Sequence, residues 1–158
     1  MTTILERLVD QLQRSAEGDA WHGPSVREVL EGVTVEDASA HPIAGAHGIR
    51  ELVLHMAAEY HLVLRRLDGD GRQLSPEEDW PVPPEPSEDA WRQEVAALLA
   101  LNQRVRAAVA TFPATHLDDP LVPDPPYSAF TQFIGLTQHD LYHAGQIVLL
   151  RRALGHPR

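Results

Sequence analysis

The sequence predicts an all-α protein folded as a four-helix bundle, with a long proline-rich crossover between its second and third main helices. Apolar residues recur at helical spacings of three and four along four long segments. No segment of useful length alternates apolar and polar residues, so sheet content is expected to be near zero. Five prolines between residues 69 and 87 are expected to exclude any regular element there.

The elements before the second main helix are predicted from apolar stripes and capping residues. Residues 2–16 carry one apolar stripe and are expected to form the first helix. Ser25 and Glu28 have the spacing of a capping box, which predicts a short helix of one to two turns after them. A further turn is expected over residues 34–37. Residues 40–48 contain proline and glycine and are expected to form a loop.

Three longer helices complete the prediction. Residues 48–68 have a wide apolar face, so this helix should be buried over much of its circumference. Residues 88–112 form the third main helix, and residues 128–154 form the fourth, after a second proline-rich loop at residues 120–126. The crossover is too short to separate two domains, and Trp80 within it can anchor it to the core. We therefore expect one domain spanning residues 1–158.

Composition excludes several classes of function. The chain has 158 residues, with 13 basic and 23 acidic side chains and a formal charge of −10, which argues against nucleic-acid and anionic-membrane partners. Cysteine and lysine are both absent, which excludes thiolate nucleophiles, zinc–thiolate sites and Schiff-base chemistry on this chain. No apolar run of about 18 residues occurs, and no secretory signal is visible, so a cytoplasmic protein is the simplest expectation.

Histidine carries the chemical signal. His139 and His143 are four residues apart on the last helix, within about 40° of each other on a face that also carries apolar residues. This spacing is a favourable chelate for a divalent metal. His55 lies on the inward face of the 48–68 helix and can meet the pair if the two helices pack. The alternative interpretation is a set of core histidines bonded to the backbone or to groups such as Asn102.

Two segments resemble a known family. Residues 45–55 and 139–147 resemble the two histidine signatures of the DinB-like (YfiT-like) metalloenzymes, and residues 21–25 resemble the N-terminal region of some members. The resemblance implies an up-down-down-up four-helix bundle, often a homodimer, that binds a divalent metal ion such as zinc or nickel. It also implies low-molecular-weight thiol transfer or hydrolysis as the chemistry. Gly48 departs from the pattern, because a serine-like helix cap is expected there.

Carried over residue by residue, the metal ligands are His55, His139 and His143. These are the same three that helical geometry selects. Three imidazole ligands leave at least one position on the ion for water, a thiol or a substrate. A site of that kind is open for chemistry.

Other side chains near the ligands have two interpretations each. Glu59 is one turn beyond His55 and is a candidate catalytic base or an acceptor for a ligand, with pairing to Arg66 as the alternative. Gln146 is a candidate for orienting a cofactor or substrate, with a polar contact at the bundle end as the alternative. Asp140 is turned about 100° from the ligands and is expected in an outer or surface role, as is Tyr142.

The remaining aromatic and histidine residues are expected to be structural or exposed. Trp21 is expected to pack at one end of the bundle. His61 is expected on the outer face of its helix. His41 and His47 are expected at the surface of their loop, with the mouth of a pocket as the alternative position for His47.

The sequence therefore predicts a metal-dependent hydrolase or thiol transferase acting on a small-molecule substrate. The alternative is a non-catalytic metal-binding or dimerisation protein, in which the ion only clamps two helices.

Overall fold

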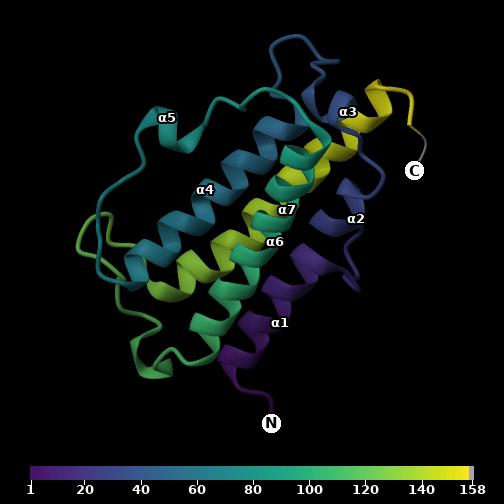
Figure 1. Ribbon diagram of the computed structural model, residues 1–158. Helices are drawn as coiled ribbons and strands as arrows, with labels where there is room; N and C mark the ends of the chain where they lie inside the picture. The colour runs from purple at the N-terminus through teal and green to yellow at the C-terminus, as the bar shows by residue number, and fades with distance from the viewer. Residues whose placement is uncertain (157–158) are drawn as a thin grey trace.

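Four long helices form a bundle in the computed structural model, which describes residues 1–156 (Figure 1). They are α1 (Ile4–Glu17), α4 (Ile49–Leu67), α6 (Glu88–Ala110) and α7 (Ala129–Ala153). α1 and α4 each pack against both α6 and α7. The helix bounds differ from the predicted ones by at most two residues, and the all-α prediction is confirmed. Within residues 1–156 no strand forms, and one isolated bridge pairs Pro120 with Ser128.

Short helices fill the connections. They are α2 (Val26–Leu30), α3 (Val35–Ser39), α5 (Pro76–Asp79) and a 3₁₀ turn, η1 (Ala114–His116). α2 packs on α1 and α7, and α3 packs on α4 and α6. The expectation that residues 69–87 hold no regular element was wrong, because α5 forms there. Pro76 is compatible with it, since a proline in the first helical turn loses no hydrogen bond that the helix would make.

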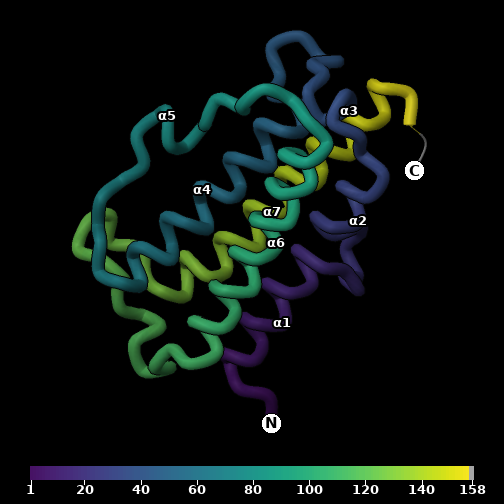
Figure 2. The backbone as a smooth tube through the Cα atoms, in the orientation of Figure 1, coloured from purple at the N-terminus to yellow at the C-terminus, as the bar shows by residue number. Residues whose placement is uncertain are grey.

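The crossover between α4 and α6 runs back along the outside of α4, with α5 about midway (Figure 2). Arg50 of α4 fixes its far end. Its guanidinium is buried and donates to both carboxylate oxygens of Glu94 at 2.7 and 2.6 Å, and to the carbonyl oxygen of Pro84 at 2.7 Å. The crossover is therefore tied to both helices that it joins.

Gly48 occupies the N-cap of α4, where a serine-like residue was expected. A Cβ at Gly48 would lie 3.1 Å from the carbonyl oxygen of Ala40 and 3.4 Å from that of Ala38. The backbone N–H of Gly48 donates to the side chain of Glu51 at 2.6 Å, so part of the cap is supplied from inside the helix. Close packing of the preceding loop explains the glycine.

Trp21 is exposed, which corrects the expectation that it packs at one end of the bundle. Its exposed fraction is 97%. The reason is that α2 already covers this part of α1 and α7, with Val26 and Val29 fully buried. No helix within residues 1–156 is long and apolar enough to cross a bilayer.

Candidate metal centre

Three histidines from two neighbouring helices converge inside the bundle. α4 supplies His55, and α7 supplies His139 and His143. The Nε2 atom of His139 lies 3.0 Å from Nε2 of His55 and 3.0 Å from Nε2 of His143. His55 and His143 are buried and His139 is partly buried. The structure thus brings together the three residues that the sequence pattern selected, in a group that could hold a metal ion.

Hydrogen bonds on the far side of two rings determine which nitrogen carries the proton. Nδ1 of His55 lies 2.8 Å from the carbonyl oxygen of Asp79, and Nδ1 of His143 lies 2.7 Å from Oε1 of Gln146. Both oxygens only accept, so each Nδ1 is the donor and each Nε2 presents a lone pair. A proton on Nε2 of His139 can satisfy one of these lone pairs and not both. Nδ1 of His139 is buried and has no hydrogen-bond partner among the described residues. This donor set fits a cation better than a hydrogen-bonded core.

The electrostatic surroundings keep the rings of His139 and His143 neutral. Burial, and then the nearby His143 and His55 rings, lower the pKa of His139 to about 3. Burial also lowers the pKa of His143, an effect that its hydrogen bond to Gln146 partly opposes. Neutral imidazole is the form that binds metal ions, so both rings are ready to act as ligands at neutral pH without first losing a proton.

An aromatic stack covers the site. Trp80 lies flat on the ring of His55, with ring centres 3.9 Å apart and planes 5° apart. His47 lies on the other face of Trp80, at 3.7 Å and 12°. The prediction that Trp80 anchors the crossover is confirmed. The contacts that Trp80 and Asp79 make with His55 were not predicted. The only signal for them in the sequence is an aromatic residue within the crossover.

Glu59 and Asp79 are both partly buried and lie close to each other and to His55. Burial raises the pKa of Glu59, and the neighbouring Asp79 carboxylate raises it further. His55, Glu59 and Asp79 form a second group of ligand-type side chains within 4.8 Å of one another. Arg66, the alternative partner of Glu59, donates to Gln132 and to Gln73 instead, each at 2.8 Å.

Asp140 serves the core, which corrects its expected outer or surface role. It is 1% exposed and accepts hydrogen bonds from Tyr60 at 2.7 Å and from Ser15 at 2.9 Å. Burial raises the pKa of Asp140 to about 7, although both hydrogen bonds act in the opposite direction. The side-chain amide of Asn102 donates hydrogen bonds to the Tyr60 hydroxyl and to the carbonyl oxygen of Leu12. Turned away from the histidines, Asp140 joins α7 to α1 and α4.

A cavity of about 400 Å³ lies next to His143 and Gln146. Its lining is mainly apolar and comes from the 40–48 loop, α4, the crossover and α7. The other lining residues are Ile43, Gly45, Ala46, His47, Leu52, Trp80, Tyr142, Leu149 and Leu150. The volume suits a small organic molecule.

Comparison with known proteins agrees with this description. The family model described as the DinB superfamily matches residues 20–147. The crystal structure of a conserved protein from Enterococcus faecalis superposes with a TM-score of 0.67, covering 99% of this chain and 100% of that chain. Its sequence identity of 18% supports a shared fold alone. No curated protein matches the sequence. Since the family match covers most of the chain, including all three histidines, this protein belongs to the DinB superfamily.

Proposed function

We propose that the protein is a metal-dependent enzyme whose ion, zinc or nickel, is held by His55, His139 and His143. The reaction would be hydrolysis of a small-molecule substrate or transfer of a low-molecular-weight thiol to one. The observation that carries the proposal is the convergence of three Nε2 atoms, of which that of His139 lies 3.0 Å from each of the other two. Imidazole ligands suit both metals, and three protein ligands leave a position for a further group.

A divalent ion in this position supplies Lewis acidity that lowers the pKa of a water or thiol. Other groups of this protein hold the ligands and take up the proton. The Asp79 carbonyl and Gln146 hold two rings in the tautomer that a ligand needs. Glu59, whose pKa is raised by burial, is our candidate for accepting the proton that activation releases. Because the chain has no cysteine, a thiol reactant must come from outside the protein.

The cavity beside His143 and Gln146 is our candidate for the substrate site. Its size argues for a small molecule, and the net charge of −10 argues against a nucleic acid. A mainly apolar lining favours a substrate with an apolar body.

A second candidate function is a metal clamp in a protein that self-associates. It is favoured by exposed apolar side chains on α7, where Tyr142 and Leu149 are 66% and 57% exposed. In that case the ion would hold α4 to α7 without reacting.

Metal analysis of protein purified without a histidine tag tests the metal site. We expect about one zinc or nickel ion per chain in the wild type, as three ligands from one chain make one site. The ion should be lost in His143→Ala and kept in His61→Ala, which removes an exposed histidine of α4. Absence of bound metal from every preparation, with no uptake of added zinc or nickel, would contradict the proposal.

Cobalt substitution separates the enzyme from the clamp. Addition of 2-mercaptoethanol to the cobalt protein should produce a sulfur-to-cobalt charge-transfer band if the ion has an open position. An unchanged spectrum would show that protein atoms fill the coordination sphere, as a purely structural ion requires.

A further inference from the structure

We infer that residues 75–80 of the crossover are part of the metal centre, with Trp80 and Asp79 as positioning residues for His55. The inference rests on the proposed function, because it concerns how one of the three ligands is aimed. It assigns a role to a segment whose prolines otherwise mark only a connection between helices.

His55 is held by the crossover at two points. Its Nδ1 atom lies 2.8 Å from the carbonyl oxygen of Asp79 and 2.9 Å from Oδ1 of the same residue. The indole of Trp80 covers the ring face at 3.9 Å in a nearly parallel stack. The hydrogen bond fixes which nitrogen is protonated, and the stack fixes the plane of the ring. Together they direct the lone pair of Nε2 toward His139.

Trp80 is itself held from both sides. His47, from the loop before α4, stacks on the face of the indole opposite His55. The indole therefore lies between two imidazole rings, and only one of them belongs to the metal centre. An indole that merely anchored the crossover to the core would not need this parallel arrangement.

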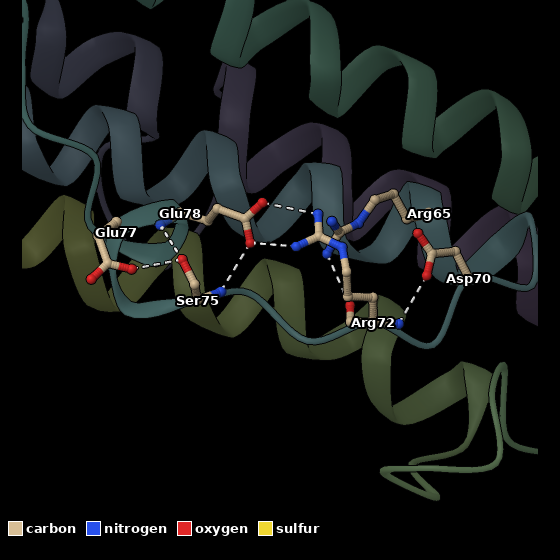
Figure 3. Close-up of polar contacts among 6 residues, drawn as sticks. All are labelled: Arg65, Asp70, Arg72, Ser75, Glu77 and Glu78. Atoms are coloured by element: carbon tan, nitrogen blue, oxygen red, sulfur yellow. Dashed lines mark hydrogen bonds and ion pairs between the residues drawn. The ribbon is translucent and has the colours of Figure 1, made fainter.

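The base of the segment is fastened to α4 by a chain of polar contacts (Figure 3). Ser75 and Glu78 form a capping box that starts α5. The guanidinium of Arg72 donates to both oxygens of Glu78 at 2.7 and 2.9 Å. Arg65 of α4 donates to the carbonyl oxygen of Arg72 at 3.0 Å. These contacts set where α5 begins and hence where Asp79 and Trp80 meet His55.

Three tryptophan variants test this role. Trp80→Ala removes the stack, Trp80→Phe keeps a flat ring, and Trp21→Ala removes an exposed tryptophan as the matched control. The dissociation constant for Zn²⁺ is measured by competition with a chromophoric chelator. We expect Trp80→Ala to weaken binding about tenfold or more, and the other two variants to stay within about threefold of the wild type.

A second measurement needs no metal. Long-range ¹H–¹⁵N spectra of the metal-free protein report the tautomer of His55. The wild type should show a protonated Nδ1 and a bare Nε2. In Trp80→Ala the ring is free to turn out of the plane that holds its hydrogen bond to the Asp79 carbonyl, so the two nitrogens should average between tautomers. A structural role for Trp80 elsewhere would leave these signals unchanged.

The outcomes are distinguishable. If the wild type binds Zn²⁺ and Trp80→Ala binds it equally tightly with the same His55 tautomer, the inference fails and the proposed function stands. If the wild type binds neither Zn²⁺ nor Ni²⁺, both fail. Should Trp80→Ala not fold, Arg72→Ala loosens the base of the segment without touching a histidine, and the same two measurements decide.

Discussion

Asp140 follows a proposed metal ligand in the sequence, yet its side chain stabilises the core. Its carboxyl group accepts from Tyr60 of α4 and Ser15 of α1, so one side chain connects three helices. We expect Asp140→Ala to lower the free energy of unfolding by about 2–4 kcal/mol, because the buried Tyr60 hydroxyl loses its acceptor and Ser15 keeps only the Leu12 carbonyl. Asp140→Asn keeps an acceptor oxygen and should cost less. Urea denaturation of both variants checks this, and equal losses would show that the hydrogen bonds contribute little.

Two glycines with different surroundings should respond in opposite directions to substitution by alanine. Gly48→Ala places a Cβ against the Ala40 carbonyl, 3.1 Å away, and should lower stability by about 1–3 kcal/mol. Gly145→Ala adds a Cβ to an exposed position of α7 with nothing within 4 Å, and should raise stability by roughly 0.5–1 kcal/mol. Thermal unfolding of the two variants measures both signs. A stabilising Gly48→Ala would mean that the loop before α4 yields easily.

Sequence reasoning found the histidines because their signal is periodic. His139 and His143 share a face by their spacing, and His55 lies on a face marked by apolar neighbours. The hydrogen bond from His55 goes to the backbone carbonyl of Asp79, which any residue type could supply, so this contact leaves no signal in the sequence. The prediction for Asp140 was wrong because it used only the angle between this residue and the histidine face of the helix. That angle shows that Asp140 points away from the histidines, but it does not reveal the buried partners Ser15 and Tyr60.

At the scale of elements, the starts of the main helices and of α2 could be predicted from the side chains that cap them. Ser25 with Glu28, Ser87 and Ser128 all accept from the backbone at the starts of α2, α6 and α7. α5 has a capping box too, at Ser75 and Glu78, but the surrounding prolines suggested that no helix could form. A four-residue helix needs only its first turn, where proline is tolerated.

The same capping box makes α5 sensitive to acid. The hydrogen bonds from Arg72, followed by that from the Ser75 backbone, lower the pKa of Glu78 to about 2. Because this pKa is lower in the folded state than the ordinary 4.5, the stabilisation of α5 is present above about pH 4.5 and is lost as the pH falls toward 2. The indole N–H signal of Trp80 should therefore move over that range in the wild type.

Glu78→Gln removes the titrating group and is the control. Its Trp80 signal should already be displaced at neutral pH and should lack the acid transition. An identical acid transition in Glu78→Gln would assign the change to another carboxyl group.

At the scale of the whole molecule, the metal centre joins helices that are distant in sequence. His55 lies in α4, and the other two histidines lie more than 80 residues later in α7. The three meet only after the bundle has formed, since α4 and α7 pack directly against each other. An ion bound there adds its binding free energy to the stability of the folded chain, because the unfolded chain offers no comparable site.

Metal-linked stability is therefore a property of the intact bundle. Zn²⁺ or Ni²⁺ at about 100 times its dissociation constant should raise the free energy of unfolding by about 2.7 kcal/mol. For a chain of this size, that corresponds to an increase of roughly 5–11 °C in Tm. The increase should vanish in His143→Ala, persist in His61→Ala and reverse with a chelator, all measured by differential scanning calorimetry. If added metal leaves the wild-type Tm unchanged, the three histidines do not share an ion in the folded protein, and their convergence must serve packing alone.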